Sequence, residues 1–161
     1  MRSSLLAFLL TLSFAVSAVD LPGRVVRVVD GDTLVIEAGD ERRKVRLAGI
    51  DAPERDQLWG DASTRELRRQ VAGRDVVVVW DKADRWDRLI GVIRLDGEGI
   101  NLHMVDRGMA WHFKRYAREQ TPEDRETYSA AEIAAQGARR GLWSDSTPVP
   151  LRWSNGLVHP S

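Results

Sequence analysis

Short apolar segments alternate with polar turns through the first half of the chain, the pattern of a small β-rich domain. The segment from Arg24 to Ile36 is rich in valine and is interrupted by Asp30-Gly31-Asp32-Thr33, a strong signal for a turn between two strands. In a third segment, from Arg42 to Ala48, apolar and basic residues alternate. This alternation predicts a strand with one apolar face and one basic face.

Two more strands and three helices are predicted further along the chain. The strands are Val76–Trp80 and Leu89–Leu95, and the helices are Asp61–Val71, a short helix opened by Asn101 and ended by Gly108, and a helix capped by Thr121 and ended by Gly137. This order predicts an α+β, mainly β fold. We expect a small five-stranded barrel of the OB-fold type with about three helices packed on it.

The two ends of the chain differ from the domain between them. Residues 1–18 carry one arginine, an apolar run and small residues before a cleavage position, which predicts a signal peptide rather than a first core helix. The apolar run is too short to span a bilayer, so we expect a secreted or periplasmic protein with no membrane attachment after cleavage. Residues 19–144 form the predicted domain, and residues 145–161 form a C-terminal tail with little periodicity.

The composition limits the kinds of metal site and nucleophile that the chain can form. The chain has no cysteine and only three histidines, which excludes disulfides, thiol nucleophiles and cysteine-ligated metals. Any metal site would therefore use oxygen ligands and bind a hard cation. The 24 basic and 24 acidic side chains cancel, so a nonspecific electrostatic coat on nucleic acid is disfavoured. All but three of the basic residues are arginine, the side chain that binds phosphate through two parallel hydrogen bonds.

Four carboxylates flank turns in the first third of the predicted domain: Asp30, Asp32, Asp51 and Glu54. Taken alone, the first pair is typical of a hairpin turn, and Asp51 with Glu54 is typical of a helix capping box. The strand that bears Arg46 connects the two pairs, so it would hold them at neighbouring ends of one sheet. We therefore treat the four carboxylates as one candidate site.

These residues belong to a series of motifs that resembles a known family. The motifs are Val29-Asp30-Gly31-Asp32-Thr33, Arg46-Leu47-Ala48-Gly49-Ile50-Asp51-Ala52-Pro53-Glu54, Asp84-Arg85-Trp86-Asp87-Arg88, Gly108-Met109-Ala110-Trp111 and Arg140-Gly141-Leu142-Trp143. In this order and spacing they resemble the staphylococcal nuclease-like, or thermonuclease, family of secreted calcium-dependent nucleases. The resemblance covers residues 24–144.

The resemblance implies a Ca²⁺ site. Its ligands would be the carboxylates of Asp32 and Asp51 and the backbone carbonyl of Ala52. So few protein ligands predict weak binding, with a dissociation constant on the order of 10⁻⁴–10⁻³ M.

The resemblance also implies catalytic roles for Arg46, Arg88 and Glu54. The two arginines would hold the scissile phosphate, and Glu54 would position or deprotonate the attacking water. This agrees with elementary chemistry, because phosphodiester hydrolysis builds negative charge on phosphoryl oxygens that guanidinium groups and a dication stabilise. The family would cleave the bond to the 5′ oxygen and leave 3′-phosphate ends.

Substrate binding is predicted at three aromatic or basic residues. Trp86 stands where the family usually has tyrosine and keeps a stacking surface, and Lys114 and Tyr116 lie in a segment that mixes basic and aromatic residues. Asp87 replaces the family's usual glycine, so its carboxylate is expected to be able to pair with Arg88 and compete with phosphate.

The sequence thus predicts a secreted, Ca²⁺-dependent nuclease. It would act on DNA and RNA, with single strands preferred because a shallow groove reads splayed bases, and we expect a monomer. A non-catalytic oligonucleotide-binding barrel is the alternative. The presence of Asp32, Arg46, Asp51, Glu54 and Arg88 together favours the enzyme.

Overall fold

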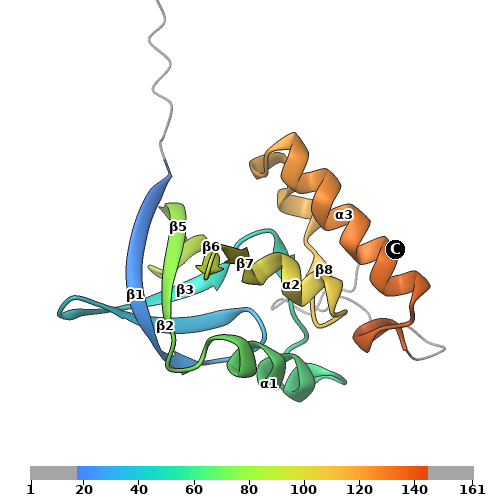
Figure 1. The fold of residues 1–161 in the computed structure, drawn as a ribbon, viewed down its shortest axis with the longest axis horizontal. Coiled ribbons are helices and arrows are strands. Elements are labelled where there is room, and N and C mark those ends of the chain that lie inside the picture. The colour runs from blue at the N-terminus through green and yellow to red at the C-terminus, as the bar shows by residue number, and fades with distance from the viewer. Residues whose placement is uncertain (1–17, 145–161) are drawn as a thin grey trace, which may run out of the picture.

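The computed structural model describes residues 18–144, and its centre is a closed five-stranded barrel (Figure 1). The strands are β1 (Val19–Val28), β2 (Thr33–Ala38), β3 (Glu41–Leu47), β5 (Asp75–Ala83) and β6 (Leu89–Leu95). They follow the order β3-β2-β1-β5-β6 with antiparallel neighbours, and a parallel pairing of β3 with β6 closes the barrel. The predicted OB-fold-like barrel is confirmed.

Three α-helices surround the barrel, as predicted. They are α1 (Gly60–Val71), α2 (Ile100–Asp106) and α3 (Pro122–Gly137). In Figure 1, α1 lies below the barrel and α3 lies on the far side of α2 from it. The remaining elements are β4 (Ile50–Asp51), β7 (Glu98–Gly99), β8 (Trp111–His112) and the 3₁₀ helices η1 (Lys114–Glu119) and η2 (Gly141–Trp143).

The first strand is longer than its sequence predicts. We expected it to begin at Arg24, but β1 begins at Val19, because the first six residues pair with β5 from Val19 opposite Trp80 to Arg24 opposite Asp75. Pro22 lies within this stretch and gives no strand signal of its own, so the pairing partner decides the boundary.

Asn101 has a different role from the one expected for it. Its buried side chain accepts a hydrogen bond from the Ile93 N–H (2.9 Å) and donates to the carbonyls of Ala48 (2.9 Å) and Gly91 (3.1 Å). The amide therefore joins α2 to β6 and to the turn after β3. Helix α2 begins one residue earlier, at Ile100.

The core follows the predicted alternation of apolar residues. Leu34 and Ile36 of β2 and Val45 and Leu47 of β3 are fully or almost fully buried. Helix α1 covers the lower end of the barrel with the buried residues Leu67 and Val71, while its three arginines are exposed. Burying these side chains contributes about 1.5–3 kcal/mol each.

Two motifs near the C-terminus meet through glycine. The carbonyl of Gly108 accepts a hydrogen bond from the Leu142 N–H (2.8 Å), and a Cβ added at Gly141 would lie 2.1 Å from that carbonyl oxygen. A Cβ added at Gly108 would equally lie 2.2 Å from the carbonyl oxygen of Arg140. Only glycine permits this close approach of two backbones. This close crossing explains the glycine at the first position of one motif and at the second position of the other.

The predicted end segments lie almost wholly outside the described residues. Only Ala18 of the predicted signal peptide is described, and none of the predicted tail. Among residues 18–144, no helix combines the length and the apolar character that crossing a membrane requires.

Glu66 forms a polar cluster on α1 that responds to pH. Its carboxylate accepts hydrogen bonds from Arg69 Nη2 (2.7 Å) and Gln70 Nε2 (3.0 Å) and lies 2.8 Å from His103 Nε2. Burial disfavours the charged carboxylate, but the hydrogen bonds from Arg69, His103 and Gln70 outweigh it and lower the pKa of Glu66 to about 2. The ionised carboxylate therefore stabilises the fold above its ordinary pKa of 4.5, and this stabilisation is lost as the pH falls toward about 2.

We expect Glu66→Gln to lower the free energy of unfolding by about 1–2 kcal/mol at neutral pH, because it removes charge-assisted hydrogen bonds. The difference from the unmodified protein should shrink as the pH falls from about 5 to about 2. Urea unfolding across this range measures it, with Glu126→Gln on the exposed side of α3 as the control. A difference that stayed constant with pH would contradict the assignment.

Candidate active site

The turn between β1 and β2 fixes the orientation of Asp32. The Asp30 carboxylate accepts a hydrogen bond from the Asp32 N–H (3.1 Å), which closes a tight turn. The Asp32 side chain is buried, and its two oxygens accept hydrogen bonds from the Thr33 hydroxyl (3.0 Å) and from the Ala52 N–H (2.8 Å). The turn therefore does more than connect two strands: it aims a carboxylate at the segment that follows β4.

Arg46 bridges the two predicted metal ligands. Its Nη1 lies 2.7 Å from Asp32 Oδ2, and its Nη2 lies 2.5 Å from Asp51 Oδ1. Nη1 also donates a hydrogen bond to the Ile50 carbonyl (3.1 Å). All three side chains are largely shielded from solvent, with 9–16% of each exposed. Arg46 thus connects Asp32 and Asp51 as predicted, but not at the ends of one sheet, because Asp51 belongs to β4, which pairs with β8 in a separate two-stranded sheet.

The carboxylates around Arg46 crowd one another. Burial raises the pKa of Asp30 to about 6, and the charge of Asp32 adds to the rise. Burial also raises the pKa of Asp51 to about 7; Arg46 opposes this rise, whereas Asp32 and Glu54 add to it. One guanidinium does not offset this many acidic groups. The cluster is therefore electrostatically suited to one more cation.

The donor atoms at this place fit a hard dication. Asp32 and Asp51 offer carboxylate oxygens and Ala52 offers a carbonyl oxygen, the ligands that Ca²⁺ prefers. Within the described part of the chain, no three acidic or histidine side chains are grouped closely enough to form a metal site by themselves. Water and substrate would have to supply the other ligands, which is consistent with the weak binding expected from the sequence.

Glu54 opens a short, hydrogen-bonded loop that leads into α1. Its N–H donates to the side-chain carbonyl of Gln57 (2.8 Å), and the Gln57 N–H donates back to the Glu54 carbonyl (2.9 Å). The Gly60 N–H then donates to the Gln57 carbonyl (3.0 Å). Helix α1 begins at Gly60 with Trp59 as its N-cap residue, so the interpretation of residues 51–54 as a helix capping box is wrong.

The Glu54 carboxylate interacts with the rest of the cluster. Burial raises its pKa, and the charge of Asp32 adds to the rise, whereas Arg46 and Arg88 oppose it. Glu54 is therefore within electrostatic reach of the buried carboxylate and of both predicted phosphate-binding arginines. A carboxylate whose pKa is raised is a better proton acceptor near neutral pH.

Asp84 holds Arg88 in place. Its Oδ2 accepts hydrogen bonds from Arg88 Nε (2.8 Å) and lies 2.7 Å from Nη2, while its Oδ1 accepts from the backbone N–H groups of Trp86 (2.9 Å) and Arg88 (3.0 Å). The sequence motif contains Asp84, but no role was predicted for it. An aspartate that opens a polar loop before a strand is a signal for such a turn, and it could have identified this residue.

The loop around Trp86 corrects one prediction. Asp87 was expected to be able to pair with Arg88, but its Oδ1 lies 3.8 Å from Arg43 Nη2 instead. Asp87 has a φ of 58°, the left-handed conformation that glycine adopts readily, and the guanidinium of Arg88 is already paired with Asp84. Trp86 is 58% exposed, with the guanidinium groups of Arg85 and Arg88 at 4.0 Å and 5.0 Å from its ring centroid.

The two other predicted substrate residues lie beside β4. The Phe113 N–H donates to the Gly49 carbonyl (2.9 Å), which places the start of η1 next to the segment that carries Asp51. Tyr116 of η1 is exposed, whereas Lys114 Nζ lies 2.6 Å from the buried carboxylate of Glu132. Lys114 therefore balances a buried charge in this structure, and its contact with substrate stays a prediction.

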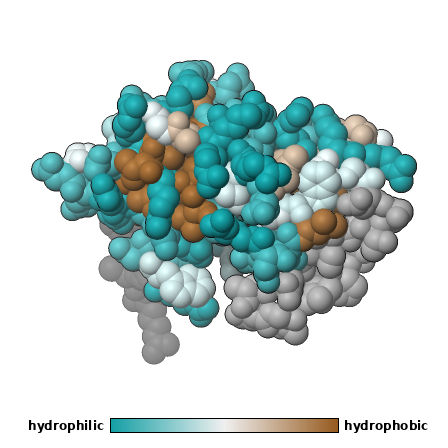
Figure 2. All heavy atoms as spheres, turned by 90° about the horizontal axis from the view of Figure 1, so that it is seen from below, coloured by the Kyte–Doolittle hydropathy of each residue, from teal (hydrophilic) through white to brown (hydrophobic). Residues whose placement is uncertain are grey.

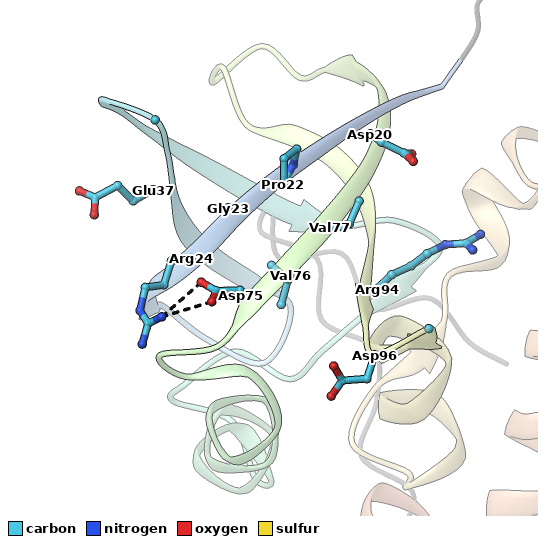
Figure 3. A pocket seen from close by; sticks show the side chains of 12 residues that line it. Asp20, Pro22, Gly23, Arg24, Glu37, Asp75, Val76, Val77, Arg94 and Asp96 are labelled. Carbon is cyan, nitrogen blue, oxygen red and sulfur yellow. Dashed lines mark hydrogen bonds and ion pairs between the residues drawn. The ribbon is translucent and has the colours of Figure 1, made fainter.

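A groove of about 660 Å³ lies on a different side of the barrel, across β1 and β5 (Figure 3). Its floor includes Pro22 and Val76, and its charged rim is Asp20, Arg24, Glu37, Asp75, Arg94 and Asp96. Arg24 is already paired with Asp75 at 3.3 Å. Acidic groups outnumber basic ones here, so this groove is unsuited to a polyanion.

Comparison with known sequences agrees with the site around Arg46. A sequence model of the family described as Staphylococcal nuclease homologue matches residues 44–145, which include Arg46, Asp51, Glu54 and Arg88. The chain belongs to the staphylococcal nuclease family. This confirms the resemblance drawn from the sequence motifs and assigns the protein to the nucleases, which are phosphodiester hydrolases.

Several relatives carry nuclease names. An "Uncharacterized endonuclease" of Escherichia coli is 37% identical over 151 residues, which cover 93% of this chain and 95% of the relative. An "Uncharacterized endonuclease" of Haemophilus influenzae is 39% identical over 132 residues, covering 81% of this chain and 71% of the relative. A "Micrococcal nuclease" of Shigella flexneri is 35% identical over 144 residues, covering 83% and 80%.

The contact between Gly60 and Glu54 gives a test of the site geometry. A Cβ added at Gly60 would lie 2.0 Å from the Glu54 carbonyl oxygen, a backbone atom that cannot rotate away. We expect Gly60→Ala to displace Glu54 and to lower kcat for phosphodiester hydrolysis about tenfold or more, with a smaller change in KM.

The control for this variant is Gly137→Ala at the end of α3, where an added Cβ would meet nothing within 4 Å. Steady-state kinetics of both variants, with circular dichroism to verify folding, measures the effect. Equal activity in the two variants would show that the Gly60 contact does not position Glu54 for the reaction.

Proposed function

We propose that this nuclease hydrolyses phosphodiester bonds of DNA and RNA with the help of Ca²⁺ and leaves 3′-phosphate ends. The observation that carries the proposal is the Arg46 bridge between Asp32 and Asp51, with Glu54 and Arg88 in electrostatic reach. These are the residue types that phosphodiester hydrolysis needs: cations for the phosphoryl oxygens and a carboxylate for the water.

Asp32, Asp51 and the carbonyl of Ala52 would hold the cation. When bound, Ca²⁺ supplies positive charge to a phosphoryl oxygen and so stabilises the negative charge that develops in the transition state. The two carboxylates have a second task in the protein itself, because they fix the guanidinium of Arg46 in one orientation. Arg46 is therefore preorganised to donate hydrogen bonds to phosphate without a change of rotamer.

Glu54 accepts the proton of the attacking water in the proposed reaction. The water oxygen bonds to phosphorus, the bond from phosphorus to the 5′ oxygen breaks, and the leaving oxygen takes a proton from solvent. Arg46 and Arg88 donate hydrogen bonds to the phosphate, whose charge increases as the water attacks. The products are a 3′-phosphate end and a 5′-hydroxyl end.

Trp86, Tyr116 and Lys114 are proposed to contact the bases and phosphates next to the scissile bond. The exposed rings of Trp86 and Tyr116 support this proposal, because stacking on a base requires an open aromatic face. Such stacking favours single strands, whose bases are free to turn outward. We propose that the protein acts as a monomer.

We also propose that the protein is exported to the periplasm or the extracellular medium after cleavage behind Ala18. The pattern of residues 1–18 supports this, and so does the start of β1 at Val19, since cleavage there would leave the barrel intact. The mass of the mature protein tests the cleavage position.

A non-catalytic binding module is the competing function. It would keep the barrel and bind nucleic acid in the presence of chelator without releasing a product. The nuclease names of the relatives and the presence of all five predicted residues favour the enzyme.

Glu54→Gln tests the proposed base. The substitution keeps the size of the side chain but removes its ability to accept a proton, so we expect hydrolysis of denatured DNA to fall about 10²–10⁴-fold while binding is retained. Release of acid-soluble nucleotides by residues 19–161 measures the rate, in millimolar calcium or in chelator. Glu126→Gln serves as the matched control.

Activity that depends on both calcium and Glu54 supports the proposal. Full activity of Glu54→Gln would exclude Glu54 as the base, and full activity in chelator would exclude the metal requirement.

The proposed bond cleavage predicts the chemistry of the product ends. Mass spectrometry of digested oligonucleotides should find 3′-phosphate and 5′-hydroxyl ends, since the 5′ oxygen is the leaving group. Denatured DNA and RNA should be cut faster than duplex DNA at the same salt concentration. Products with 5′-phosphate ends, or equal rates on duplex and denatured DNA, would overturn the respective part of the proposal.

A further inference from the structure

A row of side chains on the outer face of the sheet leads away from Arg46. Val35 of β2 pairs with Arg27 of β1 on one side and with Lys44 of β3 on the other. Paired residues of neighbouring strands point to the same face of a sheet, so these three side chains form one row. The next row toward the active site contains Arg46, paired with Thr33. Arg46 and Lys44 are two residues apart, which is about 7 Å along the strand.

The row is exposed, cationic and partly apolar. Arg27 and Lys44 are both exposed, and within residues 18–144 neither has a carboxylate within 4 Å. Between and beside them lie Val35 and Val26, of which Val26 is 42% exposed. A shallow depression of about 380 Å³ lined by Val26, Arg27, Val35 and Arg42 marks this place. We call Val26, Arg27, Val35 and Lys44 the outer row.

The neighbouring row of surface charges differs from the outer row. One row further from the active site, Glu37 lies between Arg24 and Arg42, and both arginines have acidic partners, at 3.3 Å (Asp75) and 3.5 Å (Glu37). Figure 2 shows hydrophobic residues gathered on the barrel half of the molecule, with hydrophilic residues around them. An apolar strip flanked by unpaired cations is complementary to a strand whose charges are phosphates and whose bases are flat and apolar.

We propose that the outer row binds the part of the nucleic-acid strand that continues beyond the scissile phosphate. Arg27 and Lys44 contact successive or nearby phosphates, and the valines contact sugar and base. The outer row continues the active site along the same face of the sheet, because the alternation of β3 places Lys44 and Arg46 on that face. This inference rests on the proposed function, because it assigns further contacts to the same substrate.

The test compares two double variants on substrates of two lengths. Arg27→Gln with Lys44→Gln removes both cations of the outer row. Arg65→Gln with Arg68→Gln removes two exposed cations from α1 and has the same net charge. The substrates are a strand of twelve thymidines and a dinucleotide of two thymidines, which is too short to reach from the scissile bond across the outer row.

We expect the outer-row variant to lose about fivefold or more in kcat/KM on the longer strand and clearly less on the dinucleotide. Its affinity for the longer strand, measured in chelator by fluorescence anisotropy, should depend less on salt, with the slope of log K against log salt reduced by about 1.4 for two lost phosphate contacts. The α1 variant should keep the slope of the unmodified protein.

Equal losses in the two variants would mean that only net charge matters, and that result overturns the proposal. A loss of the same size on both substrates overturns it too, because it would place the effect at the scissile bond. The binding measurement needs no catalysis. If the unmodified protein cut neither substrate, the proposed function would fail, while the salt slope would still decide whether the outer row binds the strand.

Discussion

The parallel pairing of β3 with β6 is the contact on which both the barrel and the active site depend. Val45 pairs with Leu89 and Arg46 with Ile90, so the same register closes the barrel and brings Arg88, just before β6, to the edge where Arg46 lies. A shift of one residue would turn Arg46 toward the core and Val45 or Leu47 toward solvent. The need to bury those two apolar side chains therefore determines where the Arg46 charge lies.

The sequence predicts most of this arrangement, because its signals are local. The alternation in residues 42–48 identifies the inner and outer faces of β3, and the Asp30–Thr33 motif identifies a turn. The motif series also brings Asp32, Arg46 and Asp51 into one hypothesis, and in the structure both carboxylates contact Arg46. Local patterns succeed here because each of these residues owes its orientation to its own strand or turn.

The features that the sequence does not predict depend on partners that lie elsewhere in the chain. The early start of β1 is determined by β5, and the short strands β4 and β8 exist only because they pair with each other. In the sequence Asn101 signals the start of a helix, but its buried side-chain amide hydrogen-bonds to the backbone of the barrel. The Asp87 carboxylate lies near Arg43 of β3, while Arg88 is paired with Asp84. Tertiary contacts override local signals at each of these positions.

The contacts that hold β4 in place have a consequence for the order in which the protein folds. Asp51 pairs with Trp111 of β8, and the next residue, His112, donates its N–H to the buried carboxylate of Glu132 on α3 (2.9 Å). The support of β4 thus comes from segments that are far apart in the sequence, and such contacts form late because closing long loops costs entropy. A nascent chain that has completed only its barrel strands can form the Arg46–Asp51 ion pair but lacks β8, the partner strand of β4. Addition of β8 and α3 is therefore the step that gives β4 its strand partner and that partner its anchor on α3.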